Sequence, residues 1–206
     1  MESNWAAEHL HVIRTLMERS ALYRRAMAPI MLVSGLLGTA GAVIAARYVA
    51  VESPAEFTIY WAGVAVLTLG ISLLLVRRQA LKEAEPFWST PTQRVASGLF
   101  PCFLCGLAVG ATAGFSPGLI PVWLLACLWI LYYGCALRAA GSFMQRGIKL
   151  FGSVFLLGGV LLLSSSPYCP WLRRAGTGHV LMGVFFGGLH LAYGAYLYFT
   201  ERKSAA

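Results

Sequence analysis

Acidic residues are scarce in this chain, and aspartate is missing altogether. The 206 residues include eight glutamates and sixteen lysines and arginines, which gives a net charge of +8. No glutamate falls inside a long apolar stretch; the eight are Glu2, Glu8, Glu18, Glu52, Glu56, Glu83, Glu85 and Glu201. Carriers of protons and of many cations rely on carboxylates within the membrane. Their absence therefore argues against that class of carrier.

Other chemical signatures are missing as well. The chain has no glycine-rich loop with a lysine for phosphates, no zinc-ligand spacing and no nucleotide-binding fingerprint. Cys102 and Cys105 form a Cys-x-x-Cys pair, as in quinone-linked membrane proteins that make disulfides, but no second pair is present to relay electrons. We therefore expect no catalytic residue, no cofactor site and no metal site.

What the chain does have is long apolar blocks. Apolar residues make up 58% and charged residues 12%, whereas soluble domains have about 45–50% and about 25%. Uncharged blocks of about 20 residues are long enough to cross the roughly 30 Å of membrane hydrocarbon. The sequence therefore predicts an all-α integral membrane protein, a bundle of six transmembrane helices over residues 27–200. The predicted spans are about 28–50, 57–76, 95–115, 119–137, 147–164 and 179–199.

The basic residues predict how these spans are oriented. Lysine and arginine accumulate in the cytoplasmic loops of membrane proteins, and here one set of segments is much more basic than the other. With the N-terminus inside, thirteen basic residues are cytoplasmic: Arg14, Arg19, Arg24, Arg25, Arg77, Arg78, Lys82, Arg94, Arg138, Arg146, Lys149, Arg202 and Lys203. Only Arg47, Arg173 and Arg174 are outside. We therefore expect both termini, including the tail 201–206, in the cytoplasm, with the plasma (inner) membrane as location.

Residues 1–26 are predicted to hold a cytoplasmic amphipathic helix. At 100° per residue, Trp5, Ile13, Leu16 and Met17 share its apolar side, and charged residues cover the opposite side. Such a helix docks at the lipid headgroups or on a protein partner. Basic residues that flank the apolar blocks indicate lipid rather than nucleic acid as their partner.

Glycines spaced four apart predict close helix packing. Gly106, Gly110 and Gly114 share one face of the third span, and Gly183 and Gly187 share a face of the sixth. Small residues at this spacing let helix backbones approach closely in lipid. These faces pack within the bundle or form the seam of a homo-oligomer.

Two histidines are the most informative polar residues near the spans. His179 and His190 lie eleven residues apart, so in a straight α-helix they face one way, about 16 Å apart in depth. A polar side chain such as His190 near mid-membrane is a candidate functional residue, although hydrogen bonding to a neighbouring helix is the commoner role. A ligand pocket open to the outside would be lined by a set of five residues: His190, His179, Tyr60, Trp123 and Tyr168.

The sequence leaves two functions open and ranks an enzyme third. The first is a non-enzymatic membrane protein that acts through protein or lipid contacts, as a subunit, sensor or regulator. The alternative is a transporter, or a substrate-binding transport subunit, for a neutral or apolar small molecule. The length of this chain and its six predicted helices are similar to those of the substrate-binding subunits of energy-coupling-factor vitamin transporters. This likeness is one of architecture and implies nothing about individual residues.

Overall fold

The computed structural model describes residues 27–48, 53–82, 84, 88, 90–116, 118–144 and 146–204. All regular structure in these ranges is helical, and six helices are long and apolar enough to cross a membrane. The first helix, Met27–Tyr48, is called here the N-terminal span. It is followed by α2 (Pro54–Lys82), α3 (Thr90–Phe115), α4 (Val122–Ala140), α5 (Arg146–Ser165), the 3₁₀ turn η1 (Pro170–Arg173), and a last span built of α6 (Thr177–Met182), η2 (Gly183–Leu189) and α7 (His190–Ser204). The predicted amphipathic helix with Trp5, Ile13, Leu16 and Met17 lies outside the described residues.

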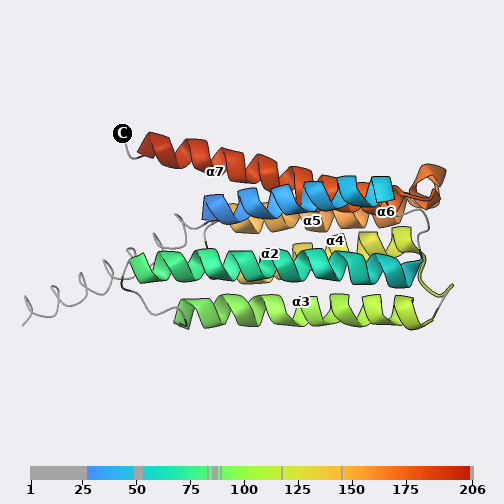
Figure 1. Ribbon diagram of the computed structural model, residues 1–206, viewed down its shortest axis with the longest axis horizontal. Helices are drawn as coiled ribbons and strands as arrows, with labels where there is room; N and C mark the ends of the chain where they lie inside the picture. The colour runs from blue at the N-terminus through green and yellow to red at the C-terminus, as the bar shows by residue number, and fades with distance from the viewer. Residues whose placement is uncertain are drawn as a thin grey trace, which may run out of the picture.

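The six helices run side by side as an up-and-down bundle (Figure 1). One end carries Ser53, the 118–121 loop and η1, and is called here the η1 end. The opposite end carries the start of the N-terminal span, the end of α2 and the described C-terminal residues. Because the described chain crosses the bundle an even number of times, its two ends lie at the same end of the bundle.

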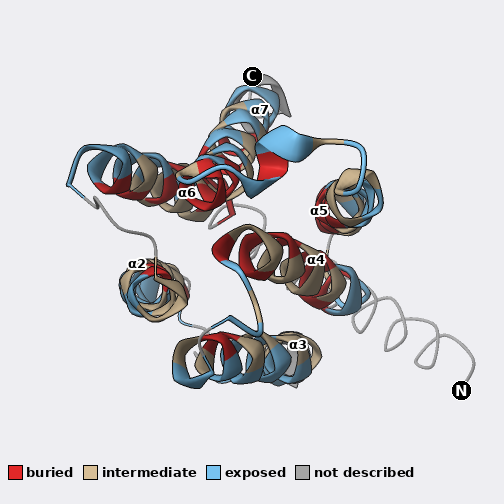
Figure 2. Ribbon diagram, turned by 90° about the vertical axis from the view of Figure 1, so that its right-hand side faces the viewer, coloured by how far each residue is buried: buried red, intermediate tan, exposed pale blue. Residues whose placement is uncertain are grey.

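Helix α4 lies in the middle of the bundle (Figure 2). It contacts α2, α3, α5 and α6, and in its most apolar stretch 44% of the residues are buried. The corresponding share is 6% in both α2 and α3, which lie at the periphery. The core thus sits around α4, on the side of α5 and the last span.

The N-terminal span and the last span cross in backbone contact. A Cβ atom added to Gly38 would lie 2.5 Å from the carbonyl oxygen of Phe186, and one added to Gly35 would lie 2.5 Å from the amide nitrogen of Leu191. Helices α4 and α5 are equally close, since a Cβ on Gly159 would lie 2.9 Å from the Cα of Leu131. Real Cβ atoms essentially never approach other atoms this closely, so these crossings depend on glycine.

Two helix boundaries differ from those expected from hydropathy. Helix α2 continues past Arg77 and Arg78 to Lys82, because leucine, arginine, alanine, glutamine and lysine all favour helix. Hydropathy does not measure this helix propensity. Helix α4 begins at Val122 rather than near 119. Pro121 restricts the residue before it to extended conformations, and Gly118 has a positive φ of 89°, so the chain is not helical there.

The start of α2 shows a capping box. The Ser53 amide donates to the Glu56 carboxylate at 3.3 Å, and the Glu56 amide donates to the Ser53 hydroxyl at 3.2 Å. Pro54 follows the cap at a position where no amide hydrogen is needed. The Ser-Pro-Ala-Glu sequence carries this signal, which the hydropathy-based span 57–76 overlooked.

Candidate functional site

The most buried polar side chain in the described part of the bundle is His190, at the start of α7. It is 2% exposed. Its ring contacts Phe151 and Phe155 of α5 edge-on, with centroids 5.0 and 5.5 Å away, and is roughly parallel to Phe186 at 6.1 Å. His190 therefore lies inside a closed aromatic packing between α4, α5 and the last span.

Two hydrogen bonds satisfy both nitrogens of this ring. Nδ1 lies 3.3 Å from the carbonyl oxygen of Phe185, and Nε2 lies 2.8 Å from the hydroxyl of Tyr133 on α4. A carbonyl oxygen only accepts, so Nδ1 carries the proton and Nε2 accepts from the Tyr133 hydroxyl. A neutral imidazole is the form that an apolar surrounding tolerates. The pair thus joins α7 to α4 without placing a charge in the core.

His179 lies in a second aromatic cluster, near the η1 end. It is 3% exposed, and its ring lies 5.1 Å from that of Phe57 and 6.0 Å from that of Tyr60. The indole N–H of Trp61 donates to His179 Nδ1 at 3.0 Å, which links α2 to α6. Tyr60 itself donates its hydroxyl to the carbonyl oxygen of Gly41 in the N-terminal span.

The two histidines therefore face different helices, α2 for His179 and α4 with α5 for His190. The expectation that both face one way assumed a straight α-helix between them. Instead, residues Gly183–Leu189 form a π-helix, whose wider turns alter the angle between successive side chains. Two of its three glycines meet the N-terminal span: a Cβ on Gly183 would lie 2.5 Å from Ala42 Cβ, and one on Gly187 2.8 Å from the Thr39 amide nitrogen.

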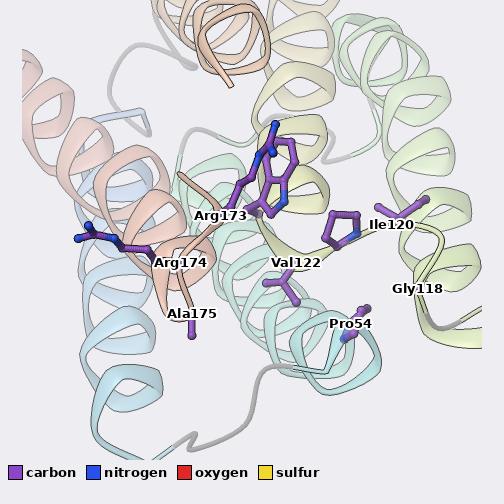
Figure 3. A pocket seen from close by; sticks show the side chains of 9 residues that line it. Pro54, Gly118, Ile120, Val122, Arg173, Arg174 and Ala175 are labelled. Carbon is purple, nitrogen blue, oxygen red and sulfur yellow. The ribbon is translucent and has the colours of Figure 1, made fainter. Parts of the chain in front are cut away.

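The five predicted pocket residues do not come together in one site, although the ring of Tyr60 packs against that of His179. A cavity of about 410 Å³ opens at the η1 end (Figure 3), and of the five predicted residues only Trp123 lines it. Tyr168 is 85% exposed, and Tyr60 is engaged with Gly41. The cavity is lined by nine residues: Pro54, Gly118, Ile120, Pro121, Val122, Trp123, Arg173, Arg174 and Ala175.

A hydropathy pattern does not identify the two arginines of this cavity as site residues. The guanidinium of Arg173 lies 5.7 Å from the centroid of the Trp123 ring and donates to the Ser166 carbonyl oxygen at 3.5 Å. Arg174 adds to the wall, but Figure 3 shows its side chain extending away from the other labelled residues. The pairing of an arginine in η1 with a tryptophan in α4 required the tertiary structure.

The predicted glycine face of α3 is closest to its neighbours at one position. A Cβ on Gly110 would lie 2.9 Å from the Trp129 ring and 3.1 Å from Thr58 Cγ2. At Gly106 and Gly114 the nearest atoms would be 3.7 and 3.6 Å away, which is ordinary contact. Gly106 instead offers its carbonyl oxygen to the indole N–H of Trp129 at 2.9 Å.

The cysteines of the described residues form no disulfide bond with one another. Cys102, Cys105, Cys127, Cys135 and Cys169 are all free thiols. Within the ranges given above, no three histidine, cysteine or acidic side chains are grouped so that they could hold a metal ion.

The comparisons with known proteins add no functional information. No protein-family model, curated protein or solved structure matches the chain.

Proposed function

We propose that this chain is a non-enzymatic integral membrane protein that acts through contacts with other proteins or with lipid. The observation that carries the proposal is the closed aromatic packing around His190, the most buried polar side chain in the described part of the bundle. A transporter for a small molecule needs a route to its central polar group, and His190 is 2% exposed behind Tyr133, Phe151 and Phe155.

The surface of the peripheral helices supports a membrane location. Large apolar side chains are exposed along the full length of α2 and α3, which water would disfavour and lipid would accept. They include Ile59, Val66, Leu67, Leu69, Leu73, Leu74, Phe100, Phe103, Leu104 and Leu107.

The charges support an orientation with both termini in the cytoplasm. In the described ranges, Arg47, Arg173 and Arg174 lie at the η1 end. The opposite end carries the larger group: Arg77, Arg78, Lys82, Arg94, Arg138, Arg146 and Lys149. By the positive-inside rule, the η1 end faces outward. Reporter fusions after Lys82 and Lys203 should then be active in the cytoplasm, and a fusion near Arg174 outside; an external signal at Lys203 would contradict six spans.

Cysteine accessibility separates the contact function from transport. In a cysteine-free background, Phe186→Cys places a thiol beside His190, and Tyr168→Cys places one at the exposed η1 end. We expect a membrane-impermeant maleimide to label Tyr168→Cys on intact cells and to leave Phe186→Cys unlabelled. Labelling of Phe186→Cys under native conditions would show that water reaches the core and would favour the transporter.

The contact itself needs its own measurement. Native mass spectrometry of the protein extracted in mild detergent should show a complex, either with a second copy or with a different subunit. A monomer in native-membrane nanodiscs, with no partner recovered, would contradict the protein-contact form of the proposal.

A further inference from the structure

The cavity at the η1 end combines two arginines, Arg173 and Arg174, with apolar walls. Its volume of about 410 Å³ lies in the range of small-molecule sites. Pro54, Ile120 and Val122 supply apolar surface from the start of α2 and from the loop and first turn of α4. The guanidinium of Arg173 lies over the Trp123 ring at the same place.

Arg173 has capacity for a further ligand. A guanidinium has five N–H donors, and here one of its nitrogens donates to the Ser166 carbonyl oxygen. The Trp123 ring holds the group by a cation–π contact. This leaves donors in a fork whose geometry matches the oxygens of a phosphate.

The surroundings favour an anion. The described residues of the η1 end include three cations, Arg47, Arg173 and Arg174, and one acid, Glu56, whose carboxylate is engaged in the capping box of α2. Pro121 at the cap of α4 provides no side-chain acceptor for the first amide groups of that helix, and the first two residues of the helix, Val122 and Trp123, line the cavity. Both features make the local potential positive.

We propose that this cavity binds the phosphate of an anionic phospholipid, with Arg173 as the residue that contacts it. The cavity is larger than a phosphate needs, and its apolar walls suit the glycerol part of a lipid better than a free ion. Exposed Tyr168 and Trp171 on the same end place the cavity at the depth where headgroups lie. The lipid form of this inference rests on the proposed membrane location.

Titration with lipid, followed by native mass spectrometry, tests the site on the full-length protein in mild detergent. We expect phosphatidylglycerol to bind in preference to phosphatidylcholine. Arg173→Gln should weaken binding of the first phosphatidylglycerol about tenfold, as expected for the loss of a hydrogen bond to a charged group. Trp123→Leu, which keeps an apolar wall but removes the ring, should weaken it by about two- to fivefold.

The neighbouring arginine is the matched control. Arg174→Gln removes the same charge from the same end, but its side chain points away from the other lining residues (Figure 3). It should change binding by less than about twofold, the size of a surface charge effect. Arg173→Lys keeps the charge but not the fork, so it should bind more weakly than the wild type and more tightly than Arg173→Gln.

The remaining outcomes distinguish a lipid phosphate from a free phosphate. They also distinguish failure of this site from failure of the proposed membrane location. If inorganic phosphate raises the denaturation temperature at constant ionic strength, and Arg173→Gln removes this shift, the site takes a free phosphate and the lipid assignment is overturned. Equal losses in Arg173→Gln and Arg174→Gln, or no preference for phosphatidylglycerol, would overturn the site itself. Release of the protein from membranes by alkaline carbonate would instead contradict the proposed membrane location.

Discussion

Helix α4 has a lower mean hydropathy than helix α2 over its most apolar stretch, 1.6 against 2.2, yet α4 is the helix that lies inside the bundle. Helix α4 is surrounded by other helices, with Leu125, Ile130 and Ala136 fully buried. Helix α2 buries only Phe57, Trp61 and Ala80, and five of its six leucines are exposed. Apolar character therefore identifies a span but does not tell whether protein or lipid surrounds it, because both are apolar.

Glycine shows the same contrast. Gly134 of α4 faces the backbone of α5, where an added Cβ would overlap the Leu156 amide nitrogen. Gly63 and Gly70 of α2 have no other atom within 4 Å of such a Cβ. One residue type thus marks a close crossing in the centre and an open surface at the periphery.

The largest effect that would sharpen this comparison is a leucine truncation. Leu125→Ala should destabilise the protein by about 2–5 kcal/mol, because it leaves a cavity next to fully buried neighbours. Leu67→Ala, at a side chain that is 53% exposed, should change stability by less than about 0.5 kcal/mol. Denaturation of the purified protein in detergent measures both, and equal losses would mean that the periphery of α2 is covered by protein.

Adding a methyl group to glycine is the next test. Gly134→Ala should destabilise by about 1–3 kcal/mol, because the α4–α5 crossing has no room for it. Gly70→Ala should be neutral or stabilise by up to about 1 kcal/mol, since alanine favours helix and the site is open. Loss of stability in Gly70→Ala, measured in the same way, would reveal a contact at the surface of α2.

Removal of one hydroxyl tests the polar link in the core. Tyr133→Phe leaves His190 Nε2 without its donor and should cost about 1–2 kcal/mol. The adjacent Tyr132→Phe removes a hydroxyl that is not part of this pair and should cost less than about 0.5 kcal/mol. Similar denaturation midpoints for the two variants would argue that water or another group reaches His190.

The smallest effects are expected along the glycine face of α3. Gly106→Ala should be neutral within about 0.5 kcal/mol, because the nearest atom would be 3.7 Å from the new methyl group. Gly110→Ala should cost up to about 1 kcal/mol, since the Trp129 and Thr58 side chains must shift by a few tenths of an ångström. A larger loss at Gly106 than at Gly110 would contradict this order and point to a seam with another chain.

Much of the bundle follows from the sequence alone, and for one reason. The number of spans depends on runs of apolar residues that must satisfy their own backbone hydrogen bonds, which only a helix achieves within a single segment. The start of α4 at Val122 depends instead on Pro121, and the extension of α2 to Lys82 depends on helix propensity; a hydropathy window averages out both signals. These signals are present in the sequence, as is the capping box at Ser53.

Tertiary structure decided where each span lies and what its polar residues contact. That His190 meets Tyr133 while His179 meets Trp61 depends on a π-helical segment and on which helices are neighbours. Whether Gly134 is indispensable and Gly70 is not depends on the distance to another backbone, and the pairing of Arg173 with Trp123 joins residues fifty positions apart. Local sequence fixes the helices because their hydrogen bonds are local; the partners across the bundle are set by shape, which is a property of the whole chain.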